Sequence, residues 1–273
     1  MSTLFPLLVD PQVLAPRLGD DELLLVDLCQ PRTWRQAHLP GARHLDPVDI
    51  LGDDPRLPGL LPGTERLEEL LGSIGYRSDQ HIVIYDDEGG GWAGRFAWLL
   101  DSIGHRNWSC LDGGLIAWYR DGLPLVRDID AVEPTRVSVQ VDRQWTASSD
   151  ELLGELDDPT LAVWDARSAE EYAGLRTGSM RAGHIPGARN LDWEMLKDPE
   201  RNYRLQEPSR LRELLTQRGI GPDQRIITYC QSHHRSGLSY LAARILGQPV
   251  RAYAGAWSEW GNRHDLPIHT SQP

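Results

Sequence analysis

Short runs of apolar, often β-branched residues alternate along this chain with segments whose apolar residues recur at helical spacing. The second half shows the pattern most clearly. It predicts strands over residues 161–164, 188–190, 225–229 and 250–252, and helices over residues 168–172, 208–218, 236–246 and 257–262. Such strands, separated by helices, are typical of an α/β fold with a parallel sheet flanked by helices on both faces. Ligands of these sheets bind beyond the carboxyl ends of the strands, so the chemistry is expected there.

The same pattern occurs twice. The motif HLPGAR at 38–43 returns as HIPGAR at 184–189. Two further blocks return in the same order: the strand and helix at 82–85 and 93–104 return at 225–228 and 238–247, and residues 112–118 return at 254–260. Three matched blocks in one order indicate a duplicated domain. We predict a first domain over residues 1–130, a polar linker over 131–145 and a second domain over 146–273, in line with the chain length.

Composition narrows the possible functions. Hydrophobic residues make up 40% and charged residues 25%, as in an ordinary globular protein with a buried core. The net charge of −12 disfavours a general nucleic-acid binder, which needs a basic face. Apolar runs are too short for a membrane span, so neither nucleic acid nor membrane is an expected partner.

The cysteines point to a reducing compartment. There are three, Cys29, Cys110 and Cys230, too few and too scattered for a disulfide framework. The first residues lack a basic region and are interrupted by Pro6, so no secretory signal is predicted. We therefore expect a cytoplasmic protein, and a monomer in which the two domains pack on each other.

Cys230 stands between a predicted buried strand and a predicted helix. Backbone N–H groups in a tight loop and at a helix start have no helical partner, and they favour a negative charge. A cysteine at this point is expected to be held as a thiolate, the nucleophilic form. Cys230 is therefore the predicted catalytic residue.

The residues that follow Cys230 can bind an anionic substrate. Arg235 is always cationic, and the two histidines can change charge with pH. The predicted substrate-binding residues are Gln231, Ser232, His233, His234 and Arg235. Ser236 is predicted to cap the helix that follows.

Three further residues are predicted to support the site. Asp165 and Arg167 end the first strand of the second domain and so face the same sheet edge. Asp165 has a counterpart in Asp27, which indicates a scaffold role. Trp193 is predicted to line the mouth of the pocket.

The first domain lacks the nucleophile. Its equivalent loop reads DDEGGG over residues 86–91, and the repeat alignment places Asp87 at the cysteine position. Because the acids of this loop would repel an anion, the first domain is predicted to be inactive.

Two motifs make the chain similar to a known family. Residues 34–42 follow the pattern aromatic, three residues, His-aliphatic-Pro-Gly-Ala, which is partly repeated at 183–188, and residues 250–260 match a second, C-terminal pattern. Both resemble the signatures of the tandem-domain rhodaneses. The resemblance implies two rhodanese-like α/β domains and sulfurtransferase activity through a Cys230 persulfide. It implies a small anionic donor such as thiosulfate, a thiophilic acceptor (cyanide, a thiol or a protein), and no metal or organic cofactor.

The chain also departs from the family pattern. Gln231 and Ser232 stand where thiosulfate-type members carry basic residues, and Glu171 stands where members often carry a substrate-binding arginine. The choice between thiosulfate, mercaptopyruvate and a protein persulfide as the donor therefore stays open.

Three other functions compete with a sulfurtransferase. A cysteine phosphatase or arsenate reductase needs Cys-x5-Arg, whereas Cys230 and Arg235 are one residue closer. A metal centre on Cys230, His233 and His234 lacks an evident fourth ligand. A sulfur-carrier module fed by a protein donor would use the same chemistry as the enzyme.

Overall fold

The structure is a computed structural model that describes residues 4–270 and divides into two compact units. Unit 1 contains the described residues up to 51, residues 62–142 and residues 197–205. Unit 2 contains residues 52–61, residues 143–196 and the described residues from 206 onward. Each unit therefore includes a short segment from the other sequence repeat.

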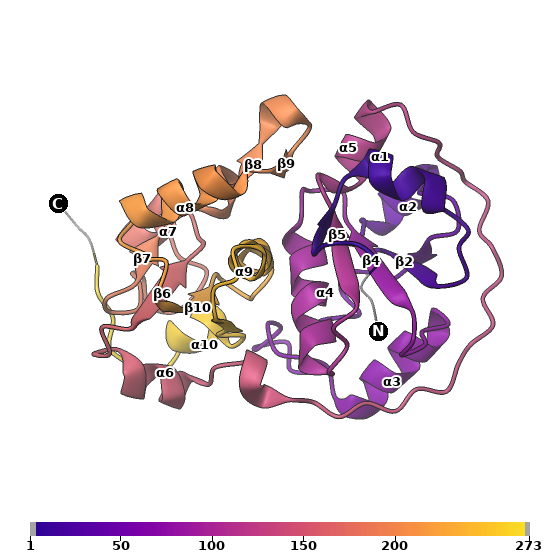
Figure 1. Ribbon diagram of the computed structural model, residues 1–273. Helices are drawn as coiled ribbons and strands as arrows, with labels where there is room; N and C mark the ends of the chain where they lie inside the picture. The colour runs from indigo at the N-terminus through magenta and orange to yellow at the C-terminus, as the bar shows by residue number, and fades with distance from the viewer. Residues whose placement is uncertain (1–3, 271–273) are drawn as a thin grey trace. The chain divides into compact units, whose positions relative to one another are not determined.

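Unit 1 is built on a five-stranded parallel sheet in the order β1-β5-β4-β2-β3 (Figure 1). Its strands are β1 (Leu8–Val9), β2 (Leu23–Asp27), β3 (Arg43–His44), β4 (His81–Tyr85) and β5 (Trp108–Leu111). Its helices are α1 (Pro11–Leu14), η1 (Ala15–Arg17), α2 (Pro31–Gln36), α3 (Thr64–Ser73), α4 (Gly91–Ser102) and α5 (Gly114–Arg120). The exchanged segment adds an antiparallel pair made of β8 (Lys197–Asp198) and β9 (Arg204–Leu205), joined by η4 (Pro199–Arg201).

Unit 2 has a four-stranded parallel sheet in the order β11-β10-β6-β7. Its strands are β6 (Leu161–Asp165), β7 (Arg189–Asn190), β10 (Arg225–Tyr229) and β11 (Val250–Ala252). Its helices are η2 (Arg143–Trp145), α6 (Ser149–Glu155), α7 (Ala169–Ala173), η3 (Trp193–Leu196), α8 (Pro208–Gln217), α9 (Arg235–Ile245) and α10 (Ala256–Trp260). The predicted α/β fold is confirmed in both repeats.

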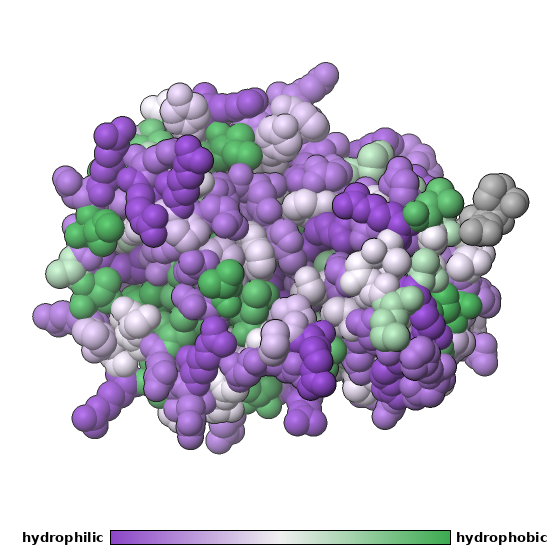
Figure 2. All heavy atoms as spheres, turned by 180° about the vertical axis from the view of Figure 1, so that it is seen from behind, coloured by the Kyte–Doolittle hydropathy of each residue, from purple (hydrophilic) through white to green (hydrophobic). Residues whose placement is uncertain are grey.

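The central strands are buried because helices cover both faces of each sheet. Ile82, Val83 and Ile84 of β4 have no exposed surface, and Ile226 and Ile227 of β10 have 1%. This double burial is why the strands read as continuous apolar runs instead of alternating ones. On the face shown in Figure 2, hydrophilic side chains predominate and hydrophobic ones form small separate groups.

The strand register fixes which residues of the two repeats are equivalent. Tyr229, the last residue of β10, pairs with Asp165, and Tyr85, the last residue of β4, pairs with Asp27. The next residue is Cys230 in unit 2 and Asp86 in unit 1. The position of the cysteine in the first repeat is therefore Asp86, and the sequence assignment of Asp87 was one residue too far along the chain.

Candidate active site

Cys230 is the first residue after β10, and α9 begins five positions later at Arg235. The side chain is 1% exposed. β10 lies between β6 and β11, so Cys230 stands at the carboxyl edge in the middle of the sheet. This is the place where the α/β architecture was predicted to put a reactive group.

The equivalent loop of unit 1 shows what the loop backbone can bind. From Asp86 to the start of α4 at Gly91 it has the same length as the Cys230 loop. The carboxylate of Asp86 accepts hydrogen bonds from the backbone N–H groups of Glu88, Gly89, Gly90 and Ala93, at 2.9–3.1 Å. The loop thus encloses an anion that its own chain supplies. That the first domain is inactive stays a prediction.

The two loops share a left-handed backbone conformation at one position, whereas at the next one Gly90 has φ +111° and His234 has φ −95°. Gly89 has φ +88° and the equivalent His233 has φ +52°, in the left-handed region that residues other than glycine seldom adopt. His233 has no exposed surface, and its Nδ1 lies 2.9 Å from Ser236 Oγ. Packing and this hydrogen bond hold the strained residue in place.

Ser236 does not cap α9. The helix begins one residue earlier, at Arg235, with His234 in the N-cap position and no side-chain cap. The prediction was wrong because the Ser236 hydroxyl bonds the His233 ring instead of a backbone N–H of the first turn.

Arg235 forms a two-pronged ion pair with Glu171. Its Nη1 and Nη2 donate to the two carboxylate oxygens at 2.6 and 2.9 Å. Burial opposes the charge of the guanidinium, but Glu171 and Cys230 together raise the pKa of Arg235. Arg235 therefore lies within electrostatic reach of Cys230, yet its own charge is already balanced by a carboxylate.

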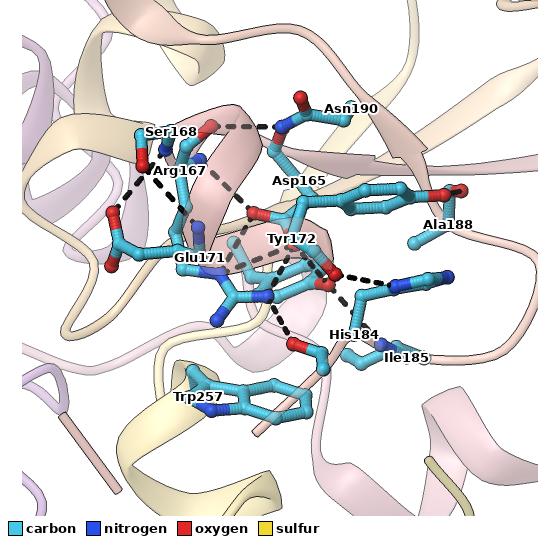
Figure 3. A network of polar contacts seen from close by, with 12 residues as sticks. Asp165, Arg167, Ser168, Glu171, Tyr172, His184, Ile185, Ala188, Asn190 and Trp257 are labelled. Atoms are coloured by element: carbon cyan, nitrogen blue, oxygen red, sulfur yellow. Dashed lines mark hydrogen bonds and ion pairs between the residues drawn. The ribbon is translucent and has the colours of Figure 1, made fainter. Parts of the chain in front are cut away.

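Asp165 and Arg167 form a buried ion pair at the carboxyl end of β6 (Figure 3). Arg167 donates from Nε and Nη2 to Asp165, at 3.0 and 2.6 Å, and its guanidinium lies 4.4 Å from the ring centre of Trp257. The backbone N–H of Trp257 donates to the carbonyl of Cys230 at 3.0 Å. This chain of contacts ties the end of β6 to the cysteine itself.

The other predicted residues surround the loop. Gln231 Nε2 donates to Ser179 Oγ at 3.1 Å, and the ring of Trp193 lies 5.6 Å from the ring of His234. Ser232 is half-buried. Ser179 was not predicted, because the turn around it matches neither motif; it also bonds the Trp257 carbonyl.

Residues 52–61, the segment of the first repeat that belongs to unit 2, also contact the Cys230 loop. The sequence did not reveal this contact. Gly59 is buried, and a Cβ atom at this position would lie 2.0 Å from the carbonyl oxygen of Ala254 and 3.0 Å from that of Ser232. The segment thus packs directly on the backbone of the loop that carries Cys230.

Cys29 and Cys110 have no comparable surroundings. Both are buried, and burial first, then nearby carboxylates, raise the pKa of each thiol well above its ordinary value.

Among residues 4–270, no three His, Cys, Asp or Glu side chains are grouped as a metal site would require. No helix in the same part of the chain is long and apolar enough to cross a membrane.

Comparison with known proteins identifies the family. The sequence profile described as the rhodanese-like domain matches residues 10–121 and 148–263. The chain belongs to the rhodanese family. The predicted tandem arrangement of two rhodanese-like domains is confirmed. The prediction that the chain is a sulfurtransferase is confirmed as well.

Relatives match over nearly their whole length. The chain is 47% identical to the thiosulfate sulfurtransferase of Pseudomonas aeruginosa, covering 96% of this chain and 97% of that one. It is 31% identical to the sulfur carrier protein TtuD of Thermus thermophilus, with 96% and 92% covered. It is 30% identical to the 3-mercaptopyruvate sulfurtransferase of Escherichia coli, with 93% and 95% covered. The crystal structure of SseA from Escherichia coli superimposes with a TM-score of 0.81 at 27% identity, covering 93% of this chain and 99% of that one.

Proposed function

We propose that this rhodanese is a thiosulfate sulfurtransferase that carries sulfur as a persulfide on Cys230. One observation supports this most strongly. Two loops of equal length follow equivalent strands, and in unit 1 the loop amides converge on the side chain of the residue after the strand, the carboxylate of Asp86. By equivalence with Glu88, Gly89 and Gly90, we expect the backbone N–H groups of Ser232, His233 and His234 to point toward the sulfur of Cys230.

In the first step, the Cys230 thiolate attacks the outer sulfur of thiosulfate. A sulfur–sulfur bond forms on Cys230, the bond between the two thiosulfate sulfurs breaks, and its electron pair leaves with sulfite. Cys230–S⁻ and S–SO₃²⁻ thus become Cys230–S–S⁻ and SO₃²⁻, with the total charge unchanged. Loop amides and the N-terminus of α9 stabilise the anionic sulfur. Loss of one such donor from an anion site costs about 10²–10³ in rate.

In the second step, an acceptor takes the outer sulfur. Cyanide attacks it, the sulfur–sulfur bond of the persulfide breaks, and the Cys230 thiolate and thiocyanate result. A thiol or a protein thiolate reacts in the same way and leaves as a persulfide. The name of the Thermus relative, a sulfur carrier protein, makes a protein acceptor the second candidate for this chain.

The residues around Cys230 contribute differently to binding the sulfur donor. We expect Gln231, Ser232 and His234 to offer hydrogen bonds to the donor. Arg235 contributes less than predicted to attracting the donor, because Glu171 balances its charge. The main-chain amides therefore carry most of the interaction with the anionic donor.

The rival phosphatase function is less well supported. The loop amides of unit 1 close around a carboxylate of the loop's own chain, and a ring of this size suits a single sulfur atom better than a phosphate. Turnover of p-nitrophenyl phosphate that disappears in Cys230→Ser would revive the rival.

The deciding experiment is thiocyanate formation from thiosulfate and cyanide by three serine variants. Cys230→Ser should reduce the rate to background. Cys29→Ser and Cys110→Ser should retain it, because both thiols are buried and their surroundings raise the pKa of each well above its ordinary value. Full activity in Cys230→Ser would contradict the proposal.

A further inference from the structure

We propose that Glu171 selects the sulfur donor: by balancing the charge of Arg235 it disfavours donors with a carboxylate on a carbon chain, such as 3-mercaptopyruvate, and leaves the site to compact donors such as thiosulfate. This inference rests on the proposed sulfurtransferase function and assigns a specificity role to a residue outside the cysteine loop.

The geometry of the pair fits this role. Arg235 is the first residue of α9, five positions after the nucleophile, and both of its terminal nitrogens donate to Glu171. The two side chains are only 22% and 12% exposed. Two-pronged arginine–carboxylate pairs are among the stronger polar contacts, and partial burial limits screening by salt. The guanidinium is therefore not available as an isolated positive charge.

A second set of contacts fixes Glu171 toward Arg235. Glu171 lies in the first turn of α7, where its carboxylate accepts the backbone N–H of Ser168 at 3.2 Å and its own N–H donates to Ser168 Oγ at 3.3 Å. This reciprocal capping box anchors the side chain at the helix start. Moving Glu171 away to release Arg235 would break the cap as well as the ion pair.

The other charged side chains around the loop do not take the place of Arg235 as a positive charge for the donor. Arg167 is fully buried and paired with Asp165. Asp192 faces the same region, where Arg235 and Glu171 both act on its carboxyl, and burial raises its pKa. Arg167 and Arg235 are thus each matched by a carboxylate.

The two donors place their charges differently. In thiosulfate the charged oxygens are bonded to the sulfur next to the one transferred, so the amides around Cys230 can reach them. In 3-mercaptopyruvate the carboxylate lies at the far end of a three-carbon chain and needs a cation of its own. Transfer from it forms Cys230–S–SH, breaks the carbon–sulfur bond, and leaves its electron pair on the pyruvate carbanion, which then takes the persulfide proton.

The test is kcat/KM for each donor with cyanide as acceptor, in wild type, Glu171→Gln and Glu170→Gln. Glutamine removes the charge but keeps a capping-box side chain. Glu171→Gln should raise the ratio of mercaptopyruvate to thiosulfate kcat/KM about 10-fold, a size typical of one freed charge contact. Glu170→Gln removes the same charge from the exposed neighbour in the same helix and should leave the ratio unchanged.

Two further variants keep the result unambiguous. Glu171→Met, also neutral and a good helix former, should change the ratio in the same direction if the glutamine variant folds poorly. Glu171→Gln combined with Arg235→Gln should lose the gain, because the freed cation is gone. An unchanged ratio in both neutral variants, or an equal loss with both donors, overturns the donor-selection role while the thiosulfate function stands. Failure of the wild type to transfer sulfur from thiosulfate overturns the function itself.

Discussion

The hydroxyl of Tyr229 donates a 2.6 Å hydrogen bond to the carboxylate of Asp165, joining the last residues of two neighbouring strands beneath the active site. Both side chains are fully buried. Asp165 also accepts hydrogen bonds from the backbone N–H and the guanidinium of Arg167, so the tyrosine adds a further donor to a carboxylate that water cannot reach. The residue after Tyr229 is the nucleophile, so this bond helps to fix where the cysteine lies.

Tyr229→Phe should therefore lower the free energy of unfolding by about 1.5–3 kcal/mol, the range for a lost hydrogen bond to a charged group. Urea unfolding measures this directly. Tyr172→Phe is the matched control, because its hydroxyl donates at 2.8 Å to an uncharged acceptor, the Ala188 carbonyl, and should cost about 0.5–1.5 kcal/mol. An equal loss of unfolding free energy in both variants would show that the bond to Asp165 stabilises the protein no more than a bond between uncharged groups.

Gly59→Ala should impair catalysis without touching a catalytic group. The added Cβ would lie 2.0 Å from the Ala254 oxygen and 3.0 Å from the Ser232 oxygen, and both are backbone atoms of the loops around Cys230. Either the exchanged segment or the cysteine loop must shift, and misplacement of this kind can reduce kcat by about 10- to 100-fold.

Gly154→Ala provides the control for this substitution. Gly154 lies in α6, and a Cβ atom added to it would meet no other atom within 4 Å. Alanine should therefore stabilise the helix by about 0.5–1 kcal/mol and leave kcat unchanged. Wild-type kcat in Gly59→Ala would mean that the segment 52–61 does not help to position the loop.

The pH dependence of stability should report on Asp86. Burial, reinforced by Glu88 and opposed by the loop amides, raises its pKa to about 6 in the folded protein, whereas an unfolded Asp has a pKa of about 3.9. The folded state then binds the proton more tightly, so this group makes the protein more stable as pH falls from 7 to 4. The gain is up to about 3 kcal/mol.

Asp86→Asn removes this titration. The difference in unfolding free energy between wild type and Asp86→Asn should shift in favour of the wild type between pH 7 and pH 4. The other buried carboxyl with a pKa of about 6, Asp112, is present in both proteins and cancels. Parallel pH profiles would contradict the assignment of Asp86 as a buried, protonatable occupant of the loop.

The sequence predicted the features that repeat or follow a local period. The strand at 225–229 agrees with β10 because a continuous apolar run at this length is read as a buried strand. The start of α9 was misplaced by one residue, since a serine before an apolar helix looks like a cap, and its bond to His233 depends on a strained backbone that no pattern marks.

The contacts that shape the site were beyond sequence reasoning because they join distant segments. Glu171 and Arg235 are 64 positions apart, and each alone reads as an ordinary charged side chain. The packing of Gly59 on Ser232 arises from an exchange of segments between the units, which leaves no local signal. The strand register was also needed to recognise that Asp86 is equivalent to Cys230. Adjacent aspartates make the alignment of the two loops by sequence ambiguous by one residue.

The most direct test of the account is the mass of the protein after treatment with thiosulfate and removal of excess reagent. We predict one additional sulfur atom per chain, located by peptide mapping on Cys230, with an equal amount of sulfite released and the mass restored by cyanide. No gain in mass, or a sulfur atom found on Cys29 or Cys110 instead, would contradict the claim that the loop around Cys230 carries the transferred sulfur.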